Sequence, residues 1–261
     1  MAATTNGHFL GVAPKQGPVL YLCLEDDDRR IQERSRLMYP EHVANWNWPD
    51  NLFFVYECPR MDLGGLEAIT NLYRDLVERG EKPCLIAIDV FQKIRPHTPR
   101  GADRYESDYD AVAAIKRLSM DLDTPILLSH HARKMDGTDA LDVVSGSQGV
   151  AGAADNIFII RKDKCGETVF DIMGRDVEPA TLWAKFNKDT CRWELCGEYE
   201  PMNRDEREIR DFLHEHGEKS LNEIAAKFGN GELRDTFRRK LGRMAEKGTI
   251  IRSGRGLFGV N

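Results

Sequence analysis

Three features are missing from this sequence, and each absence excludes a class of protein. No run of apolar residues reaches the roughly 18 to 20 that a membrane-spanning helix needs. The N-terminus lacks the basic region and apolar stretch of a secretory signal peptide. The six cysteines include no C-x-x-C pair, which argues against a zinc site or a disulfide framework. We therefore expect a cytoplasmic protein with reduced cysteines and no membrane partner.

Charge is distributed unevenly along the 261 residues. The whole chain carries a formal net charge of −6, with 37 Lys and Arg against 43 Asp and Glu. From Met202 onward the balance reverses to 13 basic against 10 acidic residues, and the last 28 residues hold 8 basic and 2 acidic ones. The C-terminal end therefore favours contact with a polyanion, whereas the acidic remainder argues against a nucleic-acid surface all round.

Short apolar runs alternate with helical patterns through the first part of the chain. Runs typical of buried strands occur at residues 18–24, 52–56, 84–88, 125–129 and 156–160. Helical patterns lie between them at residues 27–38, 64–79 and 103–121. This alternation predicts an α/β domain with a mostly parallel sheet flanked by helices, and a ligand site beyond the carboxyl ends of the strands.

Two later segments have a different pattern. Residues 168–173 and 182–186 alternate between apolar and polar side chains, which is typical of antiparallel strands. We expect them to be added at one edge of the parallel sheet. Pro201 then separates a core domain, residues 1–200, from a small C-terminal domain, residues 202–261.

Polar side chains stand where three of the predicted strands end. Glu25 follows the first strand and Asp89 follows the third, a position at which an α/β domain can hold a cation beside a nucleotide. His130 follows the strand at residues 125–129, where an imidazole can hydrogen-bond a phosphate or its attacking water. The sequence thus predicts a polar site at one edge of the sheet.

The same region also has purely structural explanations. Asp27 and Asp28 suit the N-terminus of the predicted helix that follows. Any parallel α/β enzyme can end a strand in aspartate, and the glycine-rich residues 145–149 are compatible with a simple turn. Metal binding by His130 and His131 would need a third ligand, usually a carboxylate at a defined spacing, and neither is evident in the sequence.

Five segments occur in the order and spacing of one known family. They are VLYLCLEDDDRRIQER, LIAIDVFQKIRP, ILLSHHARK, GSQGVAGAADNIFIIRK and MGRDVE. Together they resemble the RepA-like branch of the RecA-type hexameric helicase ATPases of plasmids, phages and mobile elements, over about residues 11–187. The resemblance implies a RecA-like fold, Mg²⁺ and ATP as cofactors, and a DNA-dependent ATPase or helicase subunit that acts in DNA replication.

The resemblance also implies roles for individual residues. Glu25 would be the general base that polarises the attacking water, and Asp89 the Walker B carboxylate that holds Mg²⁺. His130 would be the sensor of the γ-phosphate. The DNA-facing loop would comprise Gly146, Ser147, Gln148 and Gly149.

Arg175, in the segment MGRDVE, resembles the arginine finger that members of this family offer to the nucleotide of a neighbouring subunit. The resemblance therefore implies a homo-oligomer, which is a hexamer in this family. The alternative is an arginine at a strand edge that pairs with Asp176 or Glu178.

One element of the family is absent. Its members carry a G-x-x-x-x-G-K-[ST] loop, whose backbone N–H groups and lysine grip the β and γ phosphates, and this motif occurs nowhere in the sequence. We expect a chain that is shortened at its N-terminus and does not hydrolyse ATP by itself. Its status as an enzyme therefore stays open.

The C-terminal residues predict a winged helix. Three amphipathic helices are expected at residues 204–216, 221–228 and 232–247, followed by a hairpin that turns at residues 253–256. The predicted N-caps are Ser220 and Asn230, and the predicted left-handed stops are Gly217, Gly229 and Gly248.

The third of these helices is strongly basic. Its predicted buried stripe is Leu233, Phe237, Leu241 and Met244. A winged helix places such a helix in the major groove of DNA and its wing against the backbone, although a module that only contacts proteins is the alternative. The predicted DNA contacts are Arg234, Arg238, Arg239, Lys240, Arg243, Arg252 and Arg255.

Two functions are compatible with these observations. The first is an enzyme, a subunit of a hexameric DNA-dependent ATPase or helicase of which this chain is an incomplete copy. The second is a non-catalytic RecA-like DNA-binding protein of replication or its regulation. The expected partners are DNA and further copies of the chain or an intact ATPase paralogue.

Overall fold

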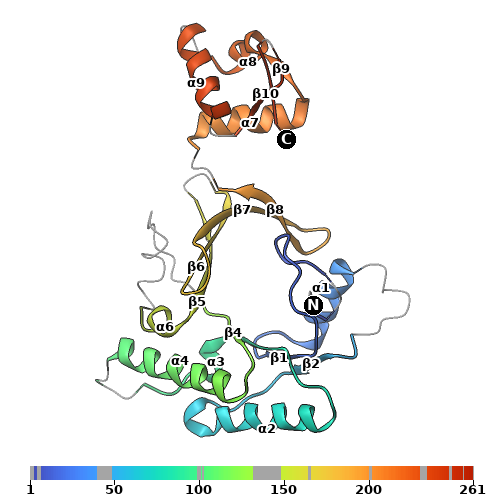
Figure 1. The fold of residues 1–261 in the computed structure, drawn as a ribbon, viewed down its shortest axis with the longest axis vertical. Coiled ribbons are helices and arrows are strands. Elements are labelled where there is room, and N and C mark those ends of the chain that lie inside the picture. Colours follow the sequence, from blue (N-terminus) through green and yellow to red (C-terminus); the bar gives the residue numbers. More distant parts are fainter. Residues whose placement is uncertain are drawn as a thin grey trace. The chain divides into compact units, whose positions relative to one another are not determined.

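The chain divides into two compact units (Figure 1). The computed structural model describes residues 3–4, 7–39, 49–98, 101, 103–131, 148–163, 166–199, 202–229, 234–246, 249–254 and 256–260. The core unit comprises Met1–Arg161 and Thr168–Gly197, and the C-terminal unit comprises Lys162–Glu167 and Glu198–Asn261. Each unit has its own cluster of buried apolar side chains. Among the described residues, no helix has the length and apolar character needed to cross a membrane.

A four-stranded parallel sheet forms the centre of the core unit. Its strands, in sheet order, are β2 (Leu52–Val55), β1 (Val19–Cys23), β3 (Leu85–Asp89) and β4 (Ile126–Leu128). All neighbouring pairs are parallel, and the register pairs Cys23 with Asp89 and Ile88 with Leu128. Strands β1, β3 and β4 therefore end at one edge of the sheet, where open α/β sheets bind their ligands.

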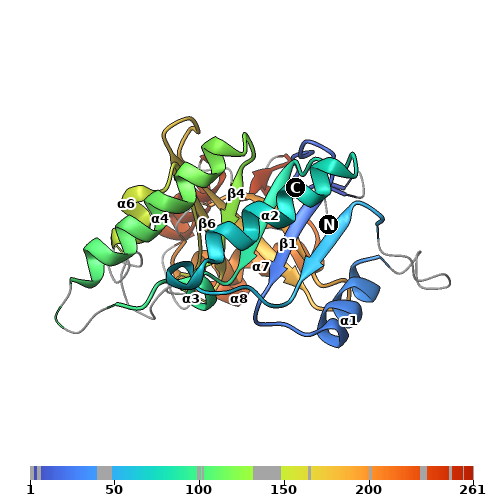
Figure 2. The same cartoon turned by 90° about the horizontal axis from the view of Figure 1, so that it is seen from below.

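Helices connect the parallel strands. They are α1 (Asp28–Met38), α2 (Gly65–Glu78), the short α3 (Phe91–Ile94) and α4 (Arg104–Asp121), with a 3₁₀ turn η2 (Met61–Leu63) before α2. Figures 1 and 2 show α2 and α4 side by side on one face of the sheet and α1 on the other. Two predicted helices begin one residue late because Asp27 and Asp103 are N-caps, whose carboxylates accept hydrogen bonds from backbone N–H groups of the first turn.

Apolar side chains of the sheet and two of these helices form the core. Strands β1 and β3 contribute Leu20, Leu22, Ile86 and Ile88, each at most 1% exposed. They pack against Ile69, Tyr73 and Leu76 of α2 and Ala111, Val112, Ile115 and Leu118 of α4. Because each large apolar side chain gains about 1.5–3 kcal/mol on full burial, this packing determines the register of the strands.

The remaining strands of the core unit form a second, separate sheet. Its order is β5 (Asn156–Lys162), β6 (Thr168–Gly174), β7 (Ala180–Asn187) and β8 (Arg192–Glu198), and β6 and β7 are antiparallel. The prediction that residues 156–160 belong to the parallel sheet is therefore wrong. So is the prediction that the later strands extend its edge, since no described backbone pairing joins β4 to β5.

Exposure explains why residues 156–160 misled the prediction. Ile159 is 5% exposed, whereas its neighbours Phe158 and Ile160 are 52% and 53% exposed. An apolar run has the same sequence signature whether one or both faces of the strand are covered. The apolar run therefore predicted a strand correctly, but its placement in the parallel sheet was wrong.

The C-terminal unit contains three helices and a small antiparallel sheet. The helices are α7 (Arg204–His216), α8 (Leu221–Phe228) and α9 (Arg234–Glu246). The strands, in sheet order, are β10 (Ile251–Arg252), β11 (Leu257–Gly259) and β9 (Lys219–Ser220). The first two predicted helices and the hairpin are confirmed. Phe237, Leu241 and Met244 of the predicted buried stripe are at most 1% exposed, and Leu233 lies outside the described residues.

Local hydrogen bonds set the ends of the C-terminal helices. Asn203 and Ser220 begin α7 and α8 with capping boxes. Gly217 has a φ of 71°, whereas Gly229 has a φ of −70°, so the left-handed stop predicted at Gly229 is wrong. A Cβ at Gly229 would lie 2.4 Å from the carbonyl oxygen of Ala225, so close contact with the helix requires glycine there. The predicted N-cap Asn230 and the predicted stop Gly248 lie outside the described residues.

A buried ion cluster attaches the loop Lys162–Glu167 to α7. Arg207 Nη2 lies 2.9 Å from Asp163 Oδ2, and the two side chains are only 9% and 5% exposed. Glu167 Oε1 lies 3.6 Å from Arg207 Nε and 3.8 Å from Arg210 Nη2. Because this loop connects β5 and β6, a fragment that begins at residue 202 would lack both carboxylates of the cluster.

We expect Asp163→Asn to destabilise the C-terminal unit. The substitution leaves the buried Arg207 guanidinium without its closest carboxylate, which costs about 3 kcal/mol. The measurement is the unfolding temperature by differential scanning calorimetry. Asp205→Asn is the matched control, because Asp205 is 65% exposed in its 3.0 Å pair with Lys240 and such surface pairs contribute about 0–1 kcal/mol. Equal effects of the two substitutions would contradict a structural role for the cluster.

Candidate functional site

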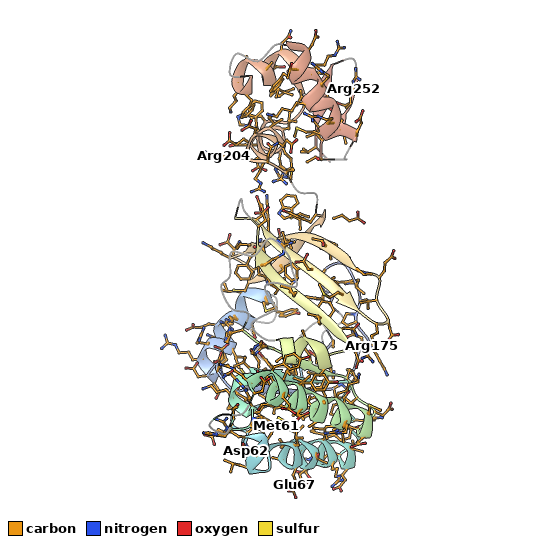
Figure 3. All side chains as sticks on the ribbon, turned by 90° about the vertical axis from the view of Figure 1, so that its left-hand side faces the viewer. Met61, Asp62, Glu67, Arg175, Arg204 and Arg252 are labelled. Carbon is orange, nitrogen blue, oxygen red and sulfur yellow. The ribbon has the colours of Figure 1, made fainter. Side chains whose placement is uncertain are left out.

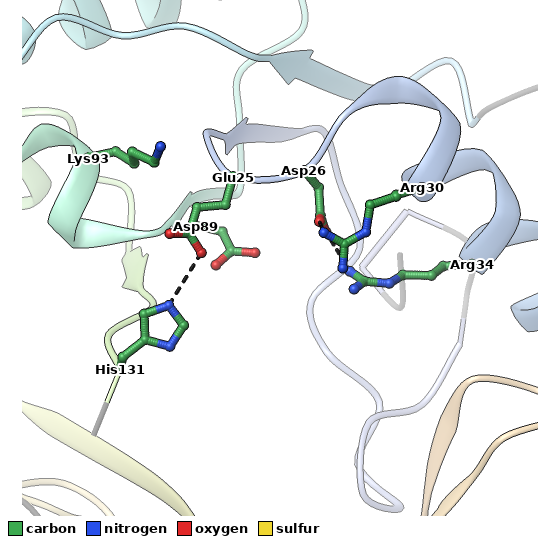
Figure 4. A pocket seen from close by; sticks show the side chains of 7 residues that line it. All are labelled: Glu25, Asp26, Arg30, Arg34, Asp89, Lys93 and His131. Atoms are coloured by element: carbon green, nitrogen blue, oxygen red, sulfur yellow. Dashed lines mark hydrogen bonds and ion pairs between the residues drawn. The ribbon is translucent and has the colours of Figure 1, made fainter. Parts of the chain in front are cut away.

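The carboxyl ends of β1, β3 and β4 meet at an open pocket of about 450 Å³. Asp89 is the last residue of β3, Glu25 lies two residues beyond β1, and His131 lies three residues beyond β4. Figure 4 shows these three side chains facing one another. The full lining is Glu25, Asp26, Arg30, Arg34, Asp89, Lys93 and His131.

Glu25 is hydrogen-bonded to His131 across the pocket. Their Oε2 and Nε2 atoms are 3.3 Å apart, and the side chains are 41% and 75% exposed (Figure 4). This contact joins residues 106 positions apart in the chain. It orients the Glu25 carboxylate while leaving it accessible to water, which is what a residue that accepts a proton from water requires.

His130, the residue predicted for this place, does not line the pocket. Its ring lies 5.9 Å from that of Phe91 in an edge-to-face arrangement, and the side chain is partly buried. Burial lowers the pKa of His130, an effect that the carboxylate of Asp108 partly offsets. Successive side chains of an extended segment point in opposite directions, so only one of two adjacent histidines can reach the pocket.

Asp89 is held from two sides. The Tyr21 hydroxyl donates a 2.9 Å hydrogen bond to Asp89 Oδ2, and the backbone N–H of Leu24 donates a 2.7 Å hydrogen bond to the Asp89 carbonyl. Burial, together with the adjacent Asp89 carboxylate, raises the pKa of Tyr21, so the phenol stays protonated and remains a donor. The peptide bond between Asp89 and Val90 is cis.

Three cationic side chains of the pocket were missed by the sequence analysis. Arg30 and Arg34 extend from α1 and form ion pairs with the two oxygens of Asp26, while Lys93 belongs to α3 (Figure 4). The i, i+4 spacing of the two arginines on the helix after Glu25 was a usable signal, because it places both on one helical face. Asp27 caps this helix as predicted, which leaves Asp26 free to hold the arginines.

Arg175 lies apart from this pocket, just beyond the end of β6 (Figure 3). Its ion pair is with Asp155, 3.8 Å away, rather than with either predicted partner, and its side chain is 69% exposed. Lys116 also contacts the Asp155 carboxylate. Arg175 is therefore accessible but anchored weakly by a surface pair.

The predicted DNA-facing loop is described only at its end. Gly149 lies in α6 (Gln148–Ala153) and is buried. A Cβ there would lie 2.2 Å from the carbonyl oxygen of Tyr105, so Gly149 permits close packing of α6 on α4. Outside the described residues lie Gly146, Ser147 and the side chain of Gln148.

The oxygen donors of the pocket suit a divalent cation that keeps most of its water ligands. The described residues contain no group of three or more His, Cys, Asp or Glu side chains able to hold a metal ion. Mg²⁺ beside a nucleotide needs only one or two carboxylates, because water and phosphate oxygens complete its octahedron. Asp89, with Glu25 nearby, fits that requirement.

Residues 1–137, just over half of the chain, match the profile of a family described as AAA domain. The chain belongs to the AAA-domain family. No curated protein matches the sequence.

The fold of this AAA-domain protein is similar to that of a solved DnaB-like replicative helicase, described with its interactions with primase. The TM-score is 0.53 at 15% sequence identity, over 68% of this chain and 51% of the helicase chain. The AAA-domain protein thus spans about half the length of that helicase chain. At this identity the likeness establishes the fold, a RecA-like parallel-sheet core with flanking helices.

The basic residues of the C-terminal unit differ in their availability to a ligand. Arg238, Arg239 and Arg243 of α9 are exposed, and so is Arg252 of β10 (Figure 3). Lys240 is 12% exposed, and its Nζ lies 3.0 Å from Asp205 Oδ2. This pair makes Lys240 a weaker candidate for phosphate contact than its neighbours. The side chain of Arg234 and the whole of Arg255 lie outside the described residues.

We expect the AAA-domain protein to lose stability as the pH falls from about 7 to about 5, partly through His130. Because its pKa is lowered in the folded state, the unfolded chain takes up this proton more readily below about pH 6.5. His130→Gln should therefore show a smaller decrease in unfolding temperature over this range. His131→Gln is the control, since that side chain is 75% exposed. Identical pH profiles for wild type and His130→Gln would refute this origin of the acid sensitivity.

Proposed function

We propose that this chain is a RecA-like subunit of the RepA-like branch, which acts as a DNA-dependent ATPase or helicase in the replication of a mobile element. One observation carries the proposal, the convergence of Glu25, Asp89 and His131 at adjacent strand ends. This set contains a base for water, an oxygen ligand for a cation and an imidazole that can hydrogen-bond a phosphate oxygen. Membership of the AAA-domain family and the helicase-like fold support it.

Each residue has a distinct role in this proposal. The Glu25 carboxylate accepts the proton of the attacking water, and its hydrogen bond to His131 Nε2 keeps it oriented. Asp89, together with water, would hold Mg²⁺, and the ion would supply positive charge that offsets the charge of the phosphates. His131 takes the sensor role that the resemblance assigned to His130, because it reaches both the pocket and Glu25.

We propose that the nucleotide lies between subunits. Arg175 is exposed and lies away from the pocket lining of its own chain, which suits an arginine that acts on a neighbouring subunit. The weak pair with Asp155 would then be exchanged for a charge-assisted bond to phosphate. We propose a homo-oligomer, and a hexamer by the family resemblance.

The chain contains no G-x-x-x-x-G-K-[ST] motif, so the usual cradle for the β and γ phosphates is missing from its residues. Lys93, Arg30 and Arg34 provide positive charge at the pocket, but the two arginines are engaged by Asp26. We therefore propose that the 261-residue chain alone binds nucleotide weakly and does not turn it over.

We expect weak, Mg²⁺-dependent ATP binding without hydrolysis. Fluorescence anisotropy of a labelled ATP analogue, with and without Mg²⁺, measures binding, and phosphate release in the presence of DNA measures turnover. Asp89→Asn should remove the Mg²⁺ dependence. Glu33→Gln is the control, because Glu33 is 54% exposed and pairs with Arg29 outside the pocket.

Two outcomes would change the assignment. Hydrolysis that disappears with Glu25→Gln but persists with Glu33→Gln would show that the chain is a complete enzyme. Binding that is absent, or indifferent to Mg²⁺ and Asp89→Asn, would favour the second candidate, a non-catalytic DNA-binding protein of replication or its regulation. The absence of a phosphate-binding loop motif is the observation that favours this second candidate.

We further propose that the C-terminal unit is a winged helix that binds DNA. Three helices followed by a β10–β11 hairpin fit this class, and α9 would be the helix in the major groove. Arg238, Arg239 and Arg243 are exposed on α9, and Arg252 is exposed beside the hairpin turn. Contacts of arginine with phosphates position a protein on DNA without reading its sequence.

We expect Arg238→Ala combined with Arg239→Ala to weaken DNA binding and to make it less sensitive to salt. Loss of two phosphate contacts lowers the slope of log K against log salt concentration by about 2. Electrophoretic or anisotropy titrations at several salt concentrations measure both quantities. Arg29→Ala combined with Arg79→Ala removes the same charge from exposed positions of the core unit and serves as the control. Unchanged affinity in the α9 variant would leave the unit as a protein-contact module.

A further inference from the structure

Tyr21 reaches across the sheet to the carboxylate that ends β3. Its hydroxyl lies 2.9 Å from Asp89 Oδ2 and donates a hydrogen bond to it. The register pairs Tyr21 with Ala87, and Asp89 lies two residues further along β3, so both side chains are on the same side of the sheet.

The ring of Tyr21 is itself held in place. Phe54 lies opposite Tyr21 in the pairing of β1 with β2, and the ring centroids are 5.6 Å apart. Phe54 in turn stacks on Tyr56 at 6.2 Å. Aromatic rings in contact prefer particular relative orientations, so these contacts restrict the rotamer of Tyr21. The hydroxyl is therefore preorganised toward Asp89.

We propose that Tyr21 is a positioning residue for the cation-binding carboxylate. Its hydrogen bond occupies Oδ2 and stops the carboxylate from rotating, so Oδ1 remains available toward the pocket and the water shell of a divalent cation. The inference rests on the proposed function, because that proposal assigns Asp89 to the cation. Hydrogen-bonding partners behind a metal ligand typically change metal affinity about 10- to 100-fold.

Tyr21→Phe tests this role, because it keeps the ring and removes only the hydroxyl. Binding of Mn²⁺ alone to the full chain is measured by the loss of the free-ion signal in electron paramagnetic resonance. We expect Tyr21→Phe to bind Mn²⁺ about tenfold more weakly than the wild type. Asp89→Asn should abolish binding at the pocket.

Tyr73→Phe is the matched control. The Tyr73 hydroxyl also makes a 2.9 Å hydrogen bond, to the carbonyl oxygen of Leu122, and it lies outside the pocket lining. Its removal should lower the unfolding temperature by an amount similar to that for Tyr21→Phe while leaving Mn²⁺ affinity unchanged. If Tyr21 had only a structural role, Tyr21→Phe and Tyr73→Phe would lower the unfolding temperature alike, and neither would change Mn²⁺ affinity.

The outcomes separate this inference from the proposed function. Wild-type Mn²⁺ affinity in Tyr21→Phe would overturn the inference and leave the proposed function intact. A wild type that binds no Mn²⁺, or that binds it equally after Asp89→Asn, would overturn the assignment of Asp89 and the inference with it. If Tyr21→Phe does not fold, Phe54→Leu replaces it, since loosening the ring should weaken Mn²⁺ binding by a smaller factor and an unchanged affinity would count against the role.

Discussion

Parallel pairing of β1 with β3, and of β3 with β4, is the constraint on which the site depends. Glu25 and Asp89 are 64 residues apart in the chain, and they come together only because their strands end at the same edge. The buried side chains Leu22 and Ile88 hold the register, since a slip of one residue would turn every apolar side chain of a strand to the opposite face. The packing that fixes the strand register therefore also sets the geometry of the pocket.

The ion pairs of the two units differ in their exposure to water. In the pocket, Glu25 and His131 are paired but largely open to water, so each can exchange its partner for a ligand. In the C-terminal unit, Asp163 and Arg207 are buried, and breaking their pair leaves an unsolvated charge. The first arrangement suits binding and proton transfer, whereas the second serves to hold a loop of the β5–β6 connection on α7.

The sequence predicts features that depend on neighbouring residues, and it fails for features that depend on tertiary packing. Caps such as Asp27 and Ser220 bond to backbone only a few residues away, so their positions follow from the sequence near them. The choice between His130 and His131 depended on the direction in which an extended segment leaves β4, which no local pattern records. Likewise, nothing near residue 156 indicates that β5 joins a different sheet.

The sequence by itself determined the longer helices, the strands of the parallel sheet and the carboxylates at two strand ends, because periodicity and capping act within one or two turns of chain. It also showed that a phosphate-binding loop is missing from these residues. Only the tertiary structure decided that Tyr21 bonds to Asp89 and that His131 bonds to Glu25. These contacts join residues 68 and 106 positions apart, and packing of the whole sheet sets the distance between them.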